Sequence, residues 1–281
     1  MWNMQSKKYK FFDTVIKVVT PEEIVDTEPY VNFLSNDEPD FTVIFEYVTK
    51  LPDLVEKITT DTEISFTTEN NKSMCWYRNH GKEGYYACRI FDGEKYIVQL
   101  LDEYRGKLWD GIVFNLLGFE EIIAKHNGVV LHASAVLKKG KMILFTAPRG
   151  TGKSTQADLW EKYANAEIVN GDKALISLKD DMIFAGGLPF SGSSDICKNI
   201  SAPLAVVVCL GQAKENKITK MNEREAFVAL LQGNYRSGIT NMSSQKTIDV
   251  LEKLCSTIPV YKLDCLPDET AVECLKRELE I

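Results

Sequence analysis

The sequence lacks the features that would mark a membrane protein, a secreted protein or a general nucleic-acid binder. Its longest purely apolar run extends only from Leu204 to Leu210, which is far too short to span a bilayer. The first residues carry no apolar core of the kind that defines a signal peptide. Basic residues are not in excess, and the formal net charge of −7 argues against a broad cationic face for nucleic acid. We therefore expect a cytoplasmic protein without a membrane or nucleic-acid partner.

Paired cysteines and histidine clusters are also missing. The seven cysteines form an odd set, no two of them are spaced C-x-x-C, and several lie in apolar runs, as Cys209 does. This pattern is typical of buried, reduced thiols in an intracellular protein. The three histidines lie apart from any group of cysteines, which argues against a zinc site.

The composition that remains is that of a globular protein with room for two domains. The chain has 281 residues, of which 44% are hydrophobic and 26% charged. Short strand-like runs dominate the first part, and we expect a small antiparallel sheet there, either a recognition platform or a brace. These runs cover residues 15–19, 41–48, 64–67, 74–77, 85–90 and 95–100. The predicted fold is mixed α/β (α+β), with a β-rich N-terminal domain (1–105) and a second domain (106–281).

A glycine-rich motif lies near the middle of the chain. Residues 147–155 fit the phosphate-loop pattern A/G-x-x-x-x-G-K-S/T, with Ala147 where glycine is commoner. An apolar run over residues 142–145 leads into the motif, and helix-compatible sequence follows it to about Ala164. The motif therefore has the strand, turn and helix that a phosphate-binding loop requires.

The residue types of this loop suit the triphosphate of a nucleotide. Small residues let successive backbone N–H groups point into one concavity, and a helix beginning near Gly152 directs its positive dipole end to the same place. Lys153 can reach the β- and γ-phosphates, and the Ser154 hydroxyl can bind Mg²⁺. The residues predicted to bind ATP with Mg²⁺ are Arg149, Gly150, Thr151, Gly152, Lys153, Ser154 and Thr155.

The segments before the loop bring a histidine into consideration. Apolar residues at helical spacing predict one helix over residues 107–126, with Gly118 as its weakest point. Residues 128–137 then predict a strand that turns at residues 138–140 into the strand feeding the loop, as an antiparallel hairpin. This hairpin places His132 roughly abreast of the phosphate site. Position alone leaves open whether His132 is functional or a packed strand residue.

An acidic residue follows the loop where phosphoryl transfer needs one. Residues 166–176 predict a strand, a turn and a strand, with Asn170, Gly171 and Asp172 in the turn. An aspartate at the end of a strand near a phosphate loop is suited to bind Mg²⁺ or to act as the catalytic base. We therefore expect Asp172 to be functional and, with Ser154, to form the metal site.

The rest of the second domain has the pattern of a supporting structure. Residues 177–185 predict a hairpin, and Asn222 with Glu225 predicts the capped start of a helix. Glycine and serine are dense over residues 186–195, which indicates a loop that either covers the site or merely connects two strands. Further elements are expected at residues 206–210 (strand), 243–256 (helix), 260–263 (strand) and from 268 onward (helix).

The order of these motifs resembles that of a known family. Leu131–His132, a hairpin, the glycine-rich loop, a helix and Asn170-Gly171-Asp172 follow one another as in the catalytic domain of HPr kinase/phosphorylase. That domain shares its core with ATP-dependent phosphoenolpyruvate carboxykinases and with kinases that tailor lasso peptides. The similarity covers about residues 125–263. It implies a P-loop nucleotide-binding core with a mixed sheet, and transfer of a phosphoryl group to a hydroxyl.

The resemblance also implies roles for individual residues. By position, Lys153 would hold the phosphates and Ser154 the metal, and His132 would match a histidine of the preceding strand. The family has two consecutive aspartates where this chain has Gly171 and Asp172. If the missing aspartate is the family's base, Asp172 only holds Mg²⁺, and then either His132 or a residue from elsewhere takes the proton, or catalysis is weak.

These observations predict an ATP-dependent kinase with Asp172, His132 and Lys153 as its catalytic residues. The expected acceptor is a serine of a peptide or protein, with a small-molecule hydroxyl as the second choice. A nucleotide-binding sensor without catalysis is the alternative from another class. A decarboxylating carboxykinase is disfavoured because no oxaloacetate-binding set of arginines is evident, and a nucleic-acid-dependent ATPase is disfavoured by the net charge. The sequence leaves open the preference for ATP or GTP, and whether the first domain contacts another subunit in a homo-oligomer.

Overall fold

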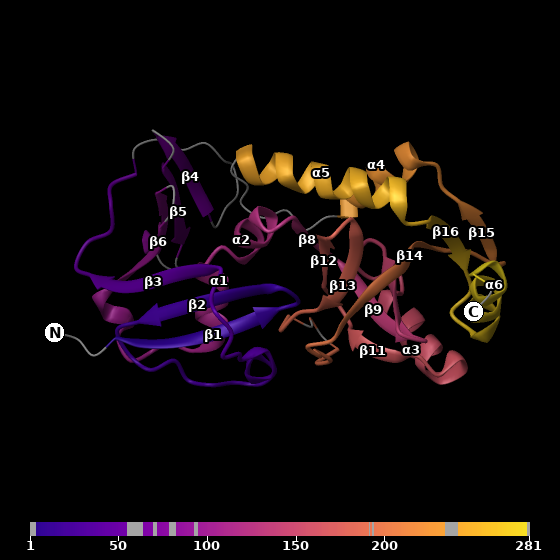
Figure 1. Ribbon diagram of the computed structural model, residues 1–281, viewed down its shortest axis with the longest axis horizontal. Coiled ribbons are helices and arrows are strands. Elements are labelled where there is room, and N and C mark those ends of the chain that lie inside the picture. The colour runs from indigo at the N-terminus through magenta and orange to yellow at the C-terminus, as the bar shows by residue number, and fades with distance from the viewer. Residues whose placement is uncertain are drawn as a thin grey trace. The chain divides into compact units, whose positions relative to one another are not determined.

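The computed structural model of the chain divides into two compact units, which we describe separately (Figure 1). Unit 1 comprises Met1–Ile122 with Ser237–Ser243, and unit 2 comprises Ile123–Arg236 with Ser244–Ile281. The structure describes residues 4–54, 64–69, 72–78, 83–92, 95–190, 192, 194–233 and 241–279. Residues 80–82 of the predicted N-terminal hairpin, and residues 191 and 193 of the predicted glycine- and serine-rich loop, lie outside this description.

Unit 1 is built on a seven-stranded sheet, in which some strands bury alternate residues. In β7, for example, Tyr96, Val98 and Leu100 are buried, whereas the residues between them are more exposed. The spatial order of the strands is β1-β2-β3-β7-β6-β5-β4. Their bounds are β1 (Gln5–Phe11), β2 (Thr14–Thr20), β3 (Phe41–Val48), β4 (Ile64–Glu69), β5 (Lys72–Arg78), β6 (Tyr85–Asp92) and β7 (Lys95–Leu101).

The expectation of a small antiparallel sheet in this part of the chain is wrong. The pairs β2–β3 and β3–β7 are parallel, so the sheet is mixed. Parallel neighbours need long connections, and the chain between β2 and β3 supplies one that contains the short 3-10 helix η1 (Tyr30–Phe33). Strand β1 was not predicted, because its three lysines mask the alternation of apolar and polar residues that buries Tyr9 and Phe11.

The helix predicted over residues 107–126 is in fact two helices, α1 (Asp110–Leu116) and α2 (Phe119–Lys125). Gly118 separates them with a φ of +74°, in the left-handed region that ends helices. The guanidinium of Arg89 fills the space beside this glycine, where a Cβ would lie only 1.7 Å from Nη1. Arg89 in turn forms a buried ion pair with Glu121 of α2, at 2.9 Å. A charged side chain from the sheet therefore fixes the break between the helices.

Residues 106–122 belong with unit 1, whereas the strand-like runs of the sequence predict a first domain that ends at residue 105. Asp110 of α1 is fully buried and accepts a hydrogen bond from the hydroxyl of Tyr9, at 2.6 Å. The ring of Phe11 meets those of Phe114 and Phe119 edge-on, with centroids 5.7 and 4.8 Å apart. These contacts join the first strand of the chain to helices about a hundred residues later, and local strand signals carry no record of them.

We expect Gly118→Ala to destabilise unit 1 more than Gly106→Ala does. The two glycines have similar φ values, +74° and +71°, so each substitution carries the cost of a left-handed alanine, about 1 kcal/mol. A Cβ at Gly106 meets open space, whereas one at Gly118 collides with Arg89, which should add about 1–3 kcal/mol. Denaturant titration gives both free energies of unfolding. Equal losses would show that Arg89 moves aside at no cost.

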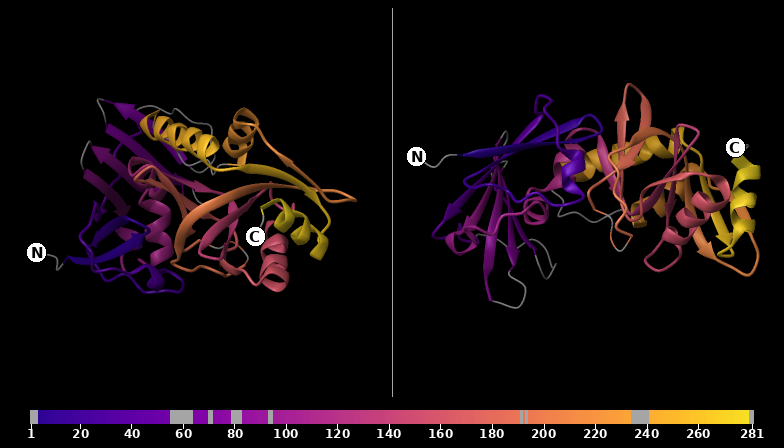
Figure 2. Two further views of the ribbon diagram at one scale, coloured as in Figure 1. Left: turned by 45° about the vertical axis from the view of Figure 1, so that its right-hand side comes forward. Right: turned by 90° about the horizontal axis from the view of Figure 1, so that it is seen from below.

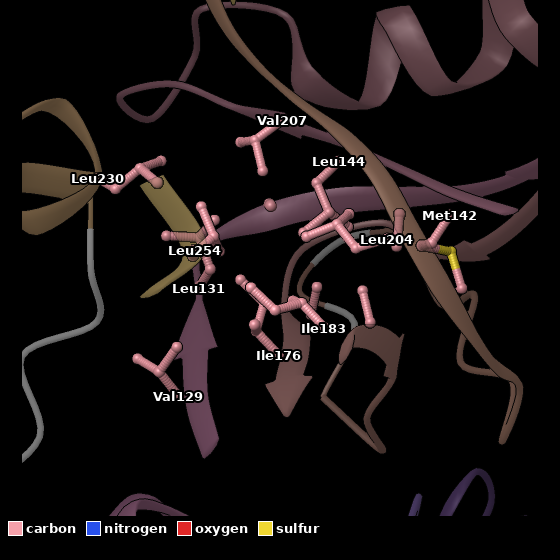
Figure 3. Packing of buried hydrophobic residues seen from close by; sticks show 14 of the residues in the cluster. Val129, Leu131, Met142, Leu144, Ile176, Ile183, Leu204, Val207, Leu230 and Leu254 are labelled. Carbon is pink, nitrogen blue, oxygen red and sulfur yellow. The ribbon is translucent and has the colours of Figure 1, made fainter. Parts of the chain in front are cut away.

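Unit 2 has helices on both faces of a mixed sheet (Figures 1 and 2). Neighbouring residues on its strands join different cores, as alternation requires. In β10, Leu144 packs with residues of α4 and α5, and Phe145 with residues of α3 and α6. Figure 3 shows the first of these cores, with Leu144 and Val207 of the sheet near Leu254 of α5. The helices are α3 (Lys153–Ala164), α4 (Glu223–Gly233), α5 (Asn241–Thr257) and α6 (Glu269–Leu279).

The long strand β14 joins the two parts of this sheet. Its first residues pair antiparallel with β13, and its later residues pair in parallel with β10 on one side and β16 on the other. The mixed α/β architecture expected from the sequence is therefore confirmed. The strands are β8 (Gly128–Leu131), β9 (Ala133–Lys138), β10 (Lys141–Thr146), β11 (Glu167–Asn170), β12 (Ala174–Lys179), β13 (Met182–Gly187), β14 (Ser201–Gln212), β15 (Lys217–Lys220) and β16 (Val260–Cys265).

Most of the helices and strands predicted for the second half of the chain are present in the structure. The predicted cap of α4 is present, because the backbone N–H of Glu225 donates to Asn222 Oδ1 (2.9 Å) and the backbone N–H of Asn222 donates to Glu225 Oε2 (3.0 Å). The loop predicted to begin at Gly186 begins later, because Gly186 and Gly187 end β13. In the part of the chain that the structure describes, no helix combines the length and hydrophobicity needed to cross a membrane.

Candidate functional site

The site lies where the pairing of β8 with β12 ends and the pairing of β9 with β11 begins. Residues 128–137 were predicted as one strand, but the chain leaves the ladder at His132, between β8 and β9. The opposing chain leaves it at residues 171–173, between β11 and β12. Ala174 pairs with Leu131 and Asn170 with Ala135, so residues 132–134 face residues 171–173 across the break. The register alone therefore brings His132 close to Asp172.

His132 and Asp172 form a hydrogen-bonded pair at this break. The imidazole Nε2 lies 2.9 Å from Asp172 Oδ1, and both side chains are about a quarter to a third exposed. Two buried hydroxyl groups hold the backbone on either side. Thr146 Oγ1 donates to the carbonyl of His132 (3.0 Å), and Ser134 Oγ donates to the carbonyl of Gly171 (2.8 Å). The pair is thus partly open to solvent but rests on a fixed backbone.

The glycine-rich loop connects β10 to α3 beside this pair. Thr146 at the end of β10 pairs with Ala133, the residue after His132, so the predicted hairpin delivers the loop to the histidine. Gly150 and Gly152 have φ values of +81° and +115°, and a Cβ at either would meet open space. The backbone conformation, rather than a lack of room, therefore requires glycine. Helix α3 begins at Lys153, directly after the loop.

Lys153 points back into the loop and is largely buried. Its side-chain amine donates to the carbonyl of Ala147, at 3.1 Å, and the residue is 7% exposed. Burial lowers the pKa of this amine from its ordinary value, and the nearby carboxylate of Asp172 opposes that shift. Ala147 is not among the residues with a positive φ, which explains why alanine is tolerated where the pattern usually has glycine.

One cavity of about 740 Å³ brings most of the predicted site residues together. Its volume lies in the range of pockets that hold a drug-sized ligand. His132 and Asp172 line it, and Gly171 lies beside them. Thr151 is the predicted residue that is not among those lining the cavity, and its backbone N–H donates to the carbonyl of Pro148 at 3.3 Å. The loop residues that do line it are Arg149, Gly150, Gly152, Lys153, Ser154 and Thr155.

Two further residues line this cavity: Lys173, which was not predicted, and Gly192, which lies in the stretch 186–195 whose role the sequence left open. Lys173 follows Asp172 directly and lies with its amine 5.3 Å from the ring centroid of Phe190. Gly192 approaches Asp172 so closely that a Cβ there would lie 2.9 Å from Asp172 Cγ. The glycine- and serine-rich stretch therefore reaches the site at Gly192. A lone lysine such as Lys173 carries no pattern that single-sequence reasoning can use.

The donor set of the cavity suits a magnesium ion only in company with phosphate. Ser154 and Asp172 supply a hydroxyl and a carboxylate oxygen, and Ser154 is exposed. Among the described residues, no group of three or more histidine, cysteine, aspartate or glutamate side chains could hold a metal. Mg²⁺ is usually bound by one or two protein oxygens together with substrate phosphates and waters. The two residues fit that arrangement.

Comparisons with known proteins add little to this geometry. No protein-family model matches the sequence, and no curated protein matches it. Among solved structures the chain is similar to the Hpr(Ser) kinase/phosphatase from Coxiella burnetii, with 11% sequence identity and a TM-score of 0.31. The similarity covers 54% of this chain and 92% of that chain. At such a TM-score it carries no argument about function, which we base on the residues of the cavity.

Proposed function

We propose that the protein is an ATP-dependent kinase that transfers the γ-phosphoryl group to a hydroxyl, with a serine of a peptide or protein as the expected acceptor. The observation that carries this proposal is a single cavity lined by both the glycine-rich loop and the His132–Asp172 pair. The loop offers backbone N–H groups, a helix N-terminus and Lys153 to an anion. The pair offers a group that can take a proton. The motif order that resembles HPr kinase supports the same assignment.

The loop residues would bind the triphosphate of ATP as substrate. The loop N–H groups other than that of Thr151, which donates to Pro148, would join the amine of Lys153 in neutralising charge that develops between the β- and γ-phosphates. Ser154 and Asp172 would hold Mg²⁺, which supplies charge neutralisation on the phosphates. Since phosphoryl transfer depends mainly on positioning and electrostatics, a preformed loop of this kind is the larger part of what catalysis needs.

The His132–Asp172 pair would take the proton of the acceptor. The acceptor oxygen forms a bond to the γ-phosphorus, the bond from that phosphorus to the bridging oxygen breaks, and ADP leaves. The acceptor's proton passes to the carboxylate of Asp172 or to the imidazole of His132. The two roles for Asp172, metal ligand and base, therefore remain alternatives that experiment must separate.

The direct test is transfer of label from ATP. Purified protein is incubated with γ-labelled ATP, Mg²⁺ and a size-fractionated extract of the host, with Asp172→Asn in parallel. Label that enters a peptide, protein or metabolite fraction only with the wild-type protein would support the proposal and identify the acceptor class. Binding of ATP without transfer to any fraction would instead favour a nucleotide-binding sensor. That alternative is consistent with Asp172 being the one carboxylate among the described residues that line the cavity.

Nucleotide affinity should fall as the pH rises through the lowered pKa of Lys153, and therefore earlier than an ordinary lysine would predict. Burial lowers the pKa of Lys153 in the free protein, whereas bound phosphates favour the charged amine and raise its pKa again. Binding therefore takes up a proton between these two pKa values, so affinity is complete below the lower one and is lost as the pH rises through it. Titration calorimetry in buffers of different ionisation enthalpy measures this uptake. Lys153→Met should bind more weakly, without the uptake; an unchanged uptake would show that another group is responsible.

A further inference from the structure

One buried side chain, Asn170, holds the turn that carries Asp172. Asn170 ends β11 and is completely buried. Its Oδ1 accepts hydrogen bonds from the backbone N–H groups of Asp172 and Lys173, both at 2.9 Å. Its Nδ2 donates to the carbonyls of Leu188 (2.7 Å) and Phe190 (3.1 Å) and makes a longer contact with Cys197 Sγ (3.8 Å). A single amide thus joins the acidic turn to the segment that follows β13.

The chemistry of this bridge requires an amide. Asn170 uses its carbonyl oxygen as a double acceptor and its amino group as a double donor, and among side chains of this size only asparagine offers both. Aspartate could accept from the turn but could not donate to the two carbonyls. Serine can hold a turn weakly through its hydroxyl, but it is too short to replace the whole bridge. Loss of the bridge leaves buried backbone groups without their partners.

The bridge positions the carboxylate of Asp172 through two sets of contacts. Asn170 Oδ1 holds the backbone N–H of Asp172 and so fixes the point from which its side chain reaches His132. Its Nδ2 also holds the carbonyl of Phe190, two residues before Gly192, and a Cβ at Gly192 would lie only 2.9 Å from Asp172 Cγ. Gly192 has a φ of +60°, so this close approach depends on a glycine conformation. Asp172 is therefore held between His132 and Gly192 by contacts that meet at Asn170.

We propose that Asn170 is a positioning residue, which sets the carboxylate of Asp172 against His132 by tying the acidic turn to the segment after β13. Asn170 does not line the cavity, so it acts through Asp172 rather than on a substrate. Its effect on catalysis rests on the proposed kinase function, whereas its effect on the His132–Asp172 pair does not.

A second asparagine in unit 2 provides a matched control. Asn216 also bridges two segments through both ends of its amide, because Nδ2 donates to Thr270 Oγ1 (2.6 Å) and Oδ1 accepts from the backbone N–H of Leu266 (2.9 Å). It does not line the cavity and touches neither His132 nor Asp172 through these bonds. Asn216→Ser therefore repeats the chemical change without any expected effect on the pair.

NMR signals of the histidine side chains provide a readout that does not depend on activity. The chain has three histidines, so the imidazole nitrogens give few NMR signals, and His132→Gln assigns those of His132. We expect Asn170→Ser to move the His132 signals toward their positions in Asp172→Asn, and Asn170→Ala to move them further. Asn216→Ser should leave them unchanged. If Asn170→Ala does not fold, Asn170→Ser carries the test, because serine keeps part of the turn.

Kinetics gives the second readout. Since Asn170 contacts neither the loop nor Lys153 through its hydrogen bonds, Asn170→Ser should lower kcat about 10- to 100-fold, as a misplaced catalytic group does, while KM for ATP changes little. A folded Asn170→Ser protein whose His132 signals stay at their wild-type positions would overturn the proposal, whatever its rate. If the wild-type protein transfers no phosphoryl group at all, the kinase assignment fails, and the NMR comparison still decides the role of Asn170.

Discussion

Lys153→Met should lower the rate of phosphoryl transfer about 10²- to 10³-fold and leave the protein folded. The amine of Lys153 is the buried cation of the cavity, and it lies at the start of α3 beside the loop that would hold the phosphates. Removing one preorganised charge that stabilises a transition state costs about 10²- to 10³-fold in rate. Methionine keeps the apolar stem of the side chain in place, so the packing around the loop is retained.

The stability of the variant distinguishes a catalytic from a structural lysine. Burial lowers the pKa of Lys153, which means that the folded protein disfavours its charge, so loss of the amine should leave the unfolding temperature unchanged or raise it. Lys162→Met, on the last turn of the same helix, is the matched control and should keep full activity. Single-turnover rates with labelled ATP, measured beside thermal unfolding, provide the comparison. Full activity in Lys153→Met would show that the site has been assigned to the wrong residues.

The local parts of the site could be predicted from the sequence, because their signals lie within a few residues. Glycines at positions that need a positive φ, followed by a helix, define the loop whatever the rest of the chain does. The turn at Asn170-Gly171-Asp172 and the hairpin from β9 to β10 were likewise found from turn residues between apolar runs. These elements depend on short-range backbone preferences, which a single sequence does record.

The pairing of His132 with Asp172 depends on long-range register, which a single sequence does not record. His132 was expected beside the loop, but the break between β8 and β9 appears only once β11 and β12 are known to lie opposite. The same limit hid the contacts of Asn170, whose five side-chain partners come from three segments of the chain. It also hid the mixed sheet of unit 1, where strand order follows crossovers rather than sequence.

Asp172→Asn should lower the rate of phosphoryl transfer about 10²- to 10⁴-fold, the range for loss of a general base. The substitution keeps the size of the side chain but removes its charge and its ability to take a proton. Nucleotide binding should persist, because the loop and Lys153 are untouched. Equilibrium binding of ATP and single-turnover transfer, each measured over a range of Mg²⁺ concentrations, give the two quantities. A variant with wild-type transfer at every Mg²⁺ concentration would remove Asp172 from the mechanism.

A double-mutant cycle with His132→Gln then separates the two roles that remain for Asp172. If the aspartate and the histidine act as one proton-accepting unit through their 2.9 Å contact, either single substitution removes that unit. The double variant should then be about as slow as the slower single one. If Asp172 only binds Mg²⁺ while His132 takes the proton, the two losses should multiply, and excess Mg²⁺ should partly rescue Asp172→Asn but not His132→Gln. The geometry favours the first outcome, because an aspartate hydrogen-bonded to an imidazole orients the histidine and stabilises the cation that forms when it accepts a proton.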